Sequence, residues 1–121
     1  PKSFKLVPTS FFVSVLFVFQ QNLSVKAEEK RRLEVQEIAL TVQNEINLAA
    51  ASTDGYYRNF TIPKQIISMD YSITTNEGVV YIATDDGKHA MALPIPSIGG
   101  NGIQKGSNIL EKQNSIIYLN P

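Results

Sequence analysis

The stretch that decides the fold is FFVSVLFVF, residues 11–19, which is apolar at eight of its nine positions. It lies within Leu6–Val25, where 20 consecutive residues carry no charge. A helix of that length is roughly 30 Å long, close to the hydrocarbon thickness of a bilayer. The polar residues Gln20–Asn22 make it a marginal membrane span. We expect eight of its side chains to need cover from outside their own chain: Phe11, Phe12, Val13, Val15, Leu16, Phe17, Val18 and Phe19.

Three interpretations of residues 1–27 are open. Lys2 and Lys5 precede the apolar block, and Val25-Lys26-Ala27 has small or apolar residues where signal peptidase reads, so one is a secretory signal cleaved after Ala27. Another is a buried helix of a soluble domain, but apolar residues on all sides would need more covering surface than about 70 further residues can offer. We favour the third interpretation, a helix that is retained in the mature protein.

After this stretch the pattern changes to a helix with one apolar side. The charge run Glu28–Arg32 is typical of a solvated helix face. Apolar residues then recur at three- and four-residue steps at Val35, Ile38, Val42, Ile46 and Ala49, with Leu33 and Leu40 beside them. Neither proline nor glycine occurs between Thr9 and Asp54, so we expect one continuous helix from about Thr9 to about Ala51, ended by Asp54-Gly55.

The remainder of the chain reads as β-strands. Hairpin-type turns stand at Asn76-Glu77-Gly78 and Asp85-Asp86-Gly87, and Gly99–Gly102 reads as a flexible loop. Apolar and polar residues alternate between Ile67 and Thr74, the pattern of a sheet with one buried face. The predicted strands are 57–62, 67–74, 79–84, 88–93 and 115–119.

These elements predict an α+β fold. A long N-terminal α-helix, hydrophobic in its first half and amphipathic in its second, is packed by a small antiparallel sheet of four to six strands. The apolar stripe of the helix is the one available cover for the sheet, so we expect a helix–sheet core at Val35, Ile38, Val42 and Ile46. Residues 1–27 then form the hydrophobic N-terminal helix, and residues 28–121 form the globular domain.

Composition disfavours several functional classes. Eleven basic and eleven acidic residues give a net charge of zero, so no bulk field attracts nucleic acid. The chain has no cysteine and one histidine, which leaves it without the usual ligands of a zinc site or a thiolate nucleophile. We expect no enzyme activity, no cofactor and no bound metal, because no nucleophile–base pair, metal set or nucleotide loop has recognisable spacing.

Individual motifs favour structural interpretations. Asp85-Asp86-Gly87 with Asp70 lacks the spacing of a calcium loop and is better explained as a hairpin turn. His89 has no second histidine or cysteine to join it at a metal. Gly99-Gly100-Asn101-Gly102 is not followed by the residues that a phosphate-binding loop requires.

Two sequence positions match the N-glycosylation acceptor pattern. Asn59-Phe60-Thr61 lies in the predicted β domain and is a candidate site if that domain faces the outside of the cell. Asn22-Leu23-Ser24 lies within the hydrophobic helix, so we discount it.

The order of the predicted elements and several short sequence motifs resemble a known family. A hydrophobic half-helix continuous with an amphipathic half that carries a small sheet is similar to a type IV pilin, and most similar to archaeal type IV pilin-like proteins made with a class III signal peptide. The residues and motifs that carry the resemblance are Glu45-Ile46-Asn47-Leu48-Ala49, Asp54-Gly55-Tyr56, Phe60, Pro63, Tyr71-Ser72-Ile73, Pro94-Ile95-Pro96, Lys105-Gly106-Ser107-Asn108 and Ile117-Tyr118. The family's short polar Gln-Ser-Glu-like start is replaced here by Pro1-Lys2-Ser3-Phe4-Lys5.

The resemblance implies a structural subunit of an extracellular, type IV-like pilus filament at the cell surface. Its partners would be copies of itself, the membrane before assembly and the pilus assembly machinery. Self-association is also favoured energetically, since burying each large apolar side chain contributes about 1.5–3 kcal/mol. Identical helices that cover one another head to tail with a screw rotation give an open fibre. The alternative is a secreted or membrane-anchored small β-rich binding module with a signal or anchor at residues 1–27.

Overall fold

The computed structural model describes residues 26–121 of the chain. The chain divides between Lys30 and Arg31, and residues 31–121 form one compact unit. The sequence predicts this boundary slightly earlier, after Ala27. Over residues 26–121, no helix is both long and apolar enough to cross a membrane. The predicted spanning stretch, Leu6–Val25, lies outside the described residues, as does the hydrophobic half of the predicted helix.

Helix α1 (Lys2–Ala51) ends at the predicted position. Ser52 closes the last turn, since its backbone N–H donates to Ala49 O and its hydroxyl donates to Leu48 O. Gly55 follows at φ +92°, a backbone conformation that glycine adopts without strain. The ammonium group of Lys112 donates to Ala50 O at 2.9 Å and to Ser52 O at 2.7 Å. A distant strand therefore supplies the cation that favours a helix C-terminus.

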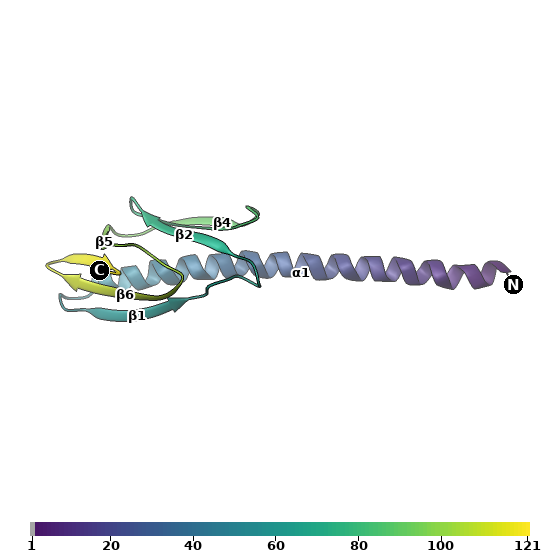
Figure 1. The fold of residues 1–121 in the computed structure, drawn as a ribbon, viewed down its shortest axis with the longest axis horizontal. Coiled ribbons are helices and arrows are strands. Elements are labelled where there is room, and N and C mark those ends of the chain that lie inside the picture. Colours follow the sequence, from purple (N-terminus) through teal and green to yellow (C-terminus); the bar gives the residue numbers. More distant parts are fainter. Residues whose placement is uncertain (1) are drawn as a thin grey trace. The chain divides into compact units, whose positions relative to one another are not determined.

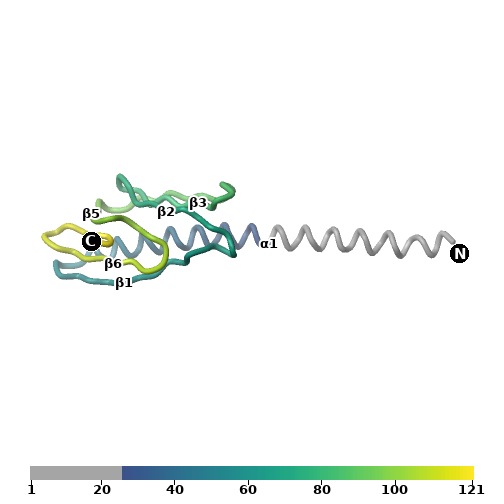
Figure 2. Tube along the Cα trace, viewed as in Figure 1, coloured from purple at the N-terminus to yellow at the C-terminus, as the bar shows by residue number. Residues whose placement is uncertain are grey.

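The strands form two sheets on either side of the C-terminal part of α1 (Figure 1). One sheet has four strands in the order β1-β6-β7-β5, where β5 runs parallel to β7 and the other pairs are antiparallel. The other sheet is antiparallel with the order β2-β3-β4. The strand bounds are β1 (Tyr57–Ile62), β2 (Tyr71–Asn76), β3 (Val79–Thr84), β4 (Ala90–Pro94), β5 (Ile98–Gly100), β6 (Gly106–Gln113) and β7 (Ile116–Leu119). Figure 2 traces β1 beside β6, although a long stretch of chain separates them.

The α+β class is therefore confirmed, with one helix packed on two small sheets, while a single antiparallel sheet is wrong. The predicted loop Gly99–Gly102 is wrong in part, because β5 pairs with β7. A Cβ atom on Gly100 would lie 2.2 Å from Leu119 O, so glycine here permits the close approach of these strands. The predicted strand 88–93 begins later, at Ala90.

The predicted strand 67–74 is wrong over its first residues. Ile67 and Ser68 have φ values of +47° and +59°, and Ile66 and Met69 form an isolated antiparallel bridge around this turn. Ile66 is fully buried while Ile67 is 38% exposed. The turn places Ile66 in the core, and the strand begins only at Tyr71. The alternating pattern predicts that Ile67 is buried, whereas the structure buries Ile66 instead.

Strand β6 was not predicted. It pairs with β1 over six residues and with β7 through a tight hairpin at Asn114 and Ser115, both of which have positive φ. These φ values match the two-residue turns that join twisted strands. The strand predicted at 115–119 is the second arm of this hairpin, β7.

The hydrophobic core takes side chains from α1 and from both sheets. Its buried members are Val35, Ile38, Ala39, Val42, Ile46, Ala49, Phe60, Ile62, Ile66, Tyr71, Val80, Ile82, Ile95, Leu110, Ile117 and Leu119. Polar contacts at its edge tie α1 to each sheet. Arg58 of β1 donates to Glu45 at 2.6 Å, and this hydrogen bond and charge raise the pKa of Arg58. Gln43 donates through its side-chain amide to Pro94 O of β4 at 2.9 Å.

Candidate self-association surface

The eight side chains predicted to pack between subunits, Phe11, Phe12, Val13, Val15, Leu16, Phe17, Val18 and Phe19, lie outside the described residues. The described part of the candidate surface is therefore the stretch of α1 from Arg31 onward. This stretch has a face turned to the sheets and a face turned to solvent.

The face of α1 turned to the sheets holds the four residues predicted for the helix–sheet core. Val35, Ile38, Val42 and Ile46 are each at most 3% exposed. Their three- and four-residue spacing puts them on one side of the helix, where they join the core cluster together with side chains of both sheets. This face of α1 is therefore buried within the unit.

The solvent face of α1 carries three exposed leucines. Leu33, Leu40 and Leu48 are 49%, 39% and 53% exposed, and we call them the leucine stripe. Their spacing of seven and eight residues is about two helical turns each time, so they follow one another along one side of the helix. Large apolar side chains in a row on a helix face are typical of a surface that contacts another chain.

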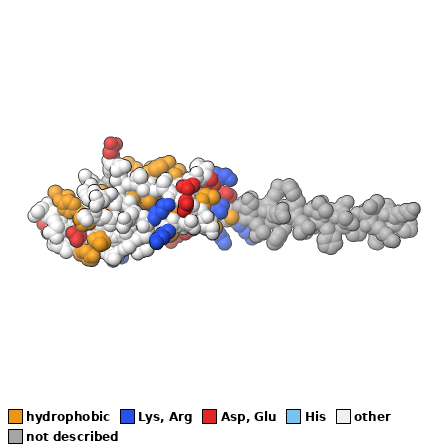
Figure 3. Space-filling view, viewed as in Figure 1, with side chains coloured by type: hydrophobic (Ala, Val, Ile, Leu, Met, Phe, Trp, Pro, Cys, Tyr) orange, Lys and Arg blue, Asp and Glu red, His pale blue; other side chains and the backbone are white. Residues whose placement is uncertain are grey.

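A shallow groove of about 410 Å³ accompanies the stripe. It is lined by Leu33, Gln36, Glu37, Leu40, Thr41 and Asn44. Glu37 is the one ionisable group in this lining, so the groove combines two apolar side chains with amide and hydroxyl groups. The face of the described unit seen in Figure 3 carries hydrophobic side chains in separate small patches among polar ones.

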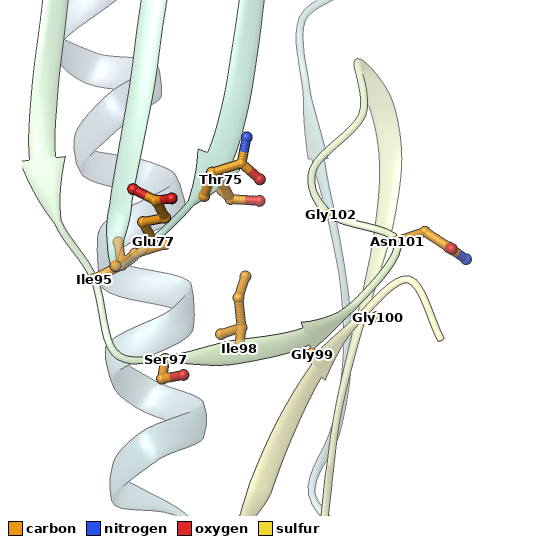
Figure 4. A pocket seen from close by; sticks show the side chains of 11 residues that line it. Thr75, Glu77, Ile95, Ser97, Ile98, Gly99, Gly100, Asn101 and Gly102 are labelled. Carbon is orange, nitrogen blue, oxygen red and sulfur yellow. The ribbon is translucent and has the colours of Figure 1, made fainter.

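A second hollow, of about 430 Å³, lies where the β2–β3 turn faces the segment from Ile95 to Gly102. In Figure 4 the side chain of Ile98 rises toward Thr75 and Glu77, whereas Asn101 points away. Much of the wall is glycine backbone, at Gly78, Gly99, Gly100 and Gly102. Glu77 is the one ionisable residue of the lining, so the hollow offers small polar groups without a pair of acid–base side chains.

In the Asp85–Gly87 turn, the carboxylate of Asp86 accepts hydrogen bonds from residues beside the turn. Thr84 Oγ1 donates to Asp86 Oδ1 at 2.7 Å and the backbone N–H of Lys88 donates to the same oxygen at 3.1 Å. The hydrogen bond from Thr84 is the main reason that the pKa of Asp86 is lowered. His89 lies one residue before β4 and accepts a hydrogen bond from Thr84 N through its backbone oxygen. Within the described residues, no group of three or more His, Cys, Asp or Glu side chains is placed to hold a metal ion.

The candidate glycosylation residue Asn59 lies in β1, one of the two edge strands of the four-stranded sheet. Its side chain is exposed. Asn59 Oδ1 accepts a hydrogen bond from Ser107 Oγ at 3.0 Å.

The leucine stripe was visible only in part from the sequence. Leu33 and Leu40 stood out beside the predicted buried stripe, but Leu48 did not. The repeat of leucine at seven and eight residues is the signal that connects the three.

Comparison with protein-family models, curated proteins and solved structures finds no match to this chain.

Proposed function

We propose that the chain is a structural subunit that polymerises through its hydrophobic N-terminal helix into an extracellular filament of the type IV pilus kind. In this proposal the protein has no enzymatic activity and needs no cofactor. Its partners are copies of itself, the membrane that holds residues 1–27 before assembly, and the machinery that assembles the filament.

The observation that carries the proposal is the contrast between two parts of the chain. Residues 11–19 are almost wholly apolar and contain four phenylalanines. The core described for residues 31–121 is assembled from side chains between Val35 and Leu119. In this proposal the phenylalanine-rich segment packs against lipid first and against identical segments later.

The leucine stripe supports the same proposal. It lies on the helix that follows the hydrophobic segment directly in the sequence, and it offers further apolar area outside the core. A surface of this kind favours contacts between copies of the chain that extend beyond residues 11–19.

The experiment that tests the proposal places charges in the hydrophobic segment. Phe12→Asp with Phe17→Asp in the full chain should abolish filaments seen by negative-stain electron microscopy, since each buried carboxylate would lack a partner. The β-sheet signal in the circular dichroism spectrum of the unit formed by residues 31–121 should remain, because no residue of the described core is changed.

The matched control is Phe12→Leu with Phe17→Leu, which keeps the segment apolar and should keep the filaments. Normal filament yield from the double aspartate variant would refute the proposal. Loss of the β-sheet signal in that variant would show that residues 11–19 belong to the fold of the unit, and would refute it as well.

A second candidate function is a secreted or membrane-anchored binding module. The hollow of about 430 Å³ beside Ile98 favours it, because a polar recess with glycine walls can admit a small ligand. The intact mass of the native protein separates the two proposals. A mature chain that begins at Glu28 supports secretion after cleavage, whereas retention of residues 11–19 together with filaments supports the first proposal.

A further inference from the structure

Strand β1 presents three residues on the same side, two of which belong to one acceptor motif. Successive side chains of a strand point to opposite faces, so Tyr57, Asn59 and Thr61 share one face. All three are exposed, while Phe60 and Ile62 on the other face belong to the core. The asparagine and the threonine that the acceptor pattern requires therefore lie side by side on an accessible surface of the edge strand.

The amide of Asn59 is oriented by its neighbour on β6. Ser107 Oγ donates to Asn59 Oδ1 at 3.0 Å, which fixes the oxygen toward β6. The other end of the planar amide, Nδ2, then points away from Ser107. Nδ2 is the atom that forms the bond to a sugar in N-glycosylation.

Tyr57 supplies a surface for the sugar itself. It is 59% exposed, the largest exposed fraction among the exposed large hydrophobic residues of the described part. Its position two residues before Asn59 puts it on the same face of β1 as the amide, one side-chain position along the strand. The C–H groups on one face of a pyranose ring pack well against the electron-rich face of an aromatic ring.

We propose that Asn59 carries an N-linked oligosaccharide whose first sugar packs on the ring of Tyr57. The donor would be a lipid-linked oligosaccharide. In the transfer, the bond between Asn59 Nδ2 and the sugar C1 forms, the bond from C1 to the lipid phosphate oxygen breaks, Nδ2 loses one proton, and the lipid phosphate leaves. This inference rests on the proposed function only in requiring that residues 31–121 are exported, and it does not require polymerisation.

The test uses the full chain produced in a host that N-glycosylates exported proteins. Accessibility to protease added outside the cell shows that the chain is exported. The exported chain is then purified and digested with trypsin, which cleaves after Arg58 and releases the peptide Asn59–Lys64. We expect mass spectrometry to find this peptide with a sugar on Asn59. Thr61→Ala should abolish the modification, and the matched variant Thr61→Ser, which keeps the hydroxyl, should retain it.

The outcomes separate this inference from the proposed function. Exported chain without sugar on Asn59 overturns the inference alone. Exported and glycosylated chain that forms no filaments overturns the proposed function alone. Failure of the chain to be exported overturns both.

The role of Tyr57 is tested by thermal unfolding of the chain before and after enzymatic removal of the sugar. We expect removal to lower the midpoint by about 4 °C, the shift that follows from losing a modest packing contact in a domain of this size. This difference should persist in Tyr57→Phe, which keeps the ring, and vanish in Tyr57→Ala. An unchanged difference in Tyr57→Ala would overturn the packing of the sugar on the ring.

Discussion

The amide of Asn108 shows how much of the sheet geometry depends on one side chain. It is fully buried. Its oxygen accepts from Gln104 N at 2.9 Å and from Asn120 Nδ2 at 2.9 Å, and its nitrogen donates to Gln104 O and Gly106 O. All four hydrogen-bonding positions of the amide are used. The residue thereby joins β6 to the segment before it and to the segment after β7.

We expect Asn108→Ala to lower the free energy of unfolding by about 2–3 kcal/mol, because it leaves buried donors and acceptors without partners. Urea unfolding of the full chain in detergent, followed by circular dichroism, measures this loss. The matched control is Asn101→Ala, which removes an exposed amide that donates to Asn120 O at 2.9 Å. Its cost should be about 1 kcal/mol or less. Equal losses in the two variants would contradict the role assigned to Asn108.

At the scale of elements, the sequence predicts what depends on local pattern. The end of α1, the strand β1 and the strand β3 follow from residue spacing and from turn residues within a few positions. Strand β6 escaped prediction because Ile109 and Leu110 are adjacent and the buried position 108 is a polar asparagine, so no clean alternation exists. Its strand character comes from pairing with β1, which is remote in the sequence.

The candidate surface on α1 could likewise be predicted only as far as it depends on local pattern. Helical spacing places the buried residues and the leucines on different sides of α1, which local pattern can show. Whether Leu33, Leu40 and Leu48 stay exposed depends on how far the two sheets extend around the helix. That extent is set by the number and order of strands, which depend on pairings between remote segments.

The leucine stripe leads to a prediction for assembly. Leu40→Lys with Leu48→Lys should reduce filament yield, because the substitutions place two charges on the surface that we assign to contacts between copies. The unfolding midpoint should change little, since both side chains are substantially exposed in the single chain. Electron microscopy of assembled material and thermal unfolding of the dissociated chain measure the two effects.

The control for this prediction is Val79→Lys with Tyr81→Lys. These residues are also exposed apolar side chains, but they lie on β3 rather than on the helix. Filaments should persist in this variant. If it reduces filament yield as strongly as the leucine variant, the loss is a general effect of added charge and the stripe has no special role.

At the scale of the whole molecule, Tyr71 connects the core to the pH dependence of stability. Its ring is almost fully buried, its hydroxyl donates to Pro63 O, and Lys105 Nζ lies 4.8 Å from the ring centroid. Burial raises the pKa of Tyr71 to about 12, with a smaller contribution from Glu34. The folded state therefore favours the neutral phenol more strongly than the unfolded state does.

The sign of this effect predicts alkaline destabilisation. An unfolded tyrosine loses its proton near its ordinary pKa of 10.0, whereas Tyr71 in the fold keeps it until about 12. Its contribution to stability is present below pH 10 and is lost as the pH rises from about 10 to 12. Tyr71→Phe should flatten the fall in unfolding free energy across this window, at a cost of about 1 kcal/mol at neutral pH for the lost hydrogen bond.

Urea unfolding at a series of pH values checks this prediction. Tyr81→Phe serves as the matched control, because it removes the hydroxyl of a tyrosine that is 46% exposed rather than buried. The same slope in Tyr71→Phe as in the parent would show that other groups cause the alkaline loss.

The position of β7 constrains how the protein is made. This strand lies inside the four-stranded sheet, between β6 and β5, although it follows both in the chain. Asn120, just beyond it, donates its backbone N–H to Ile109 O and its side-chain amide to Gly102 O. A ribosome must therefore release residues 116–120 before this sheet can close. The other three strands of this sheet are therefore synthesised before the strand that completes it.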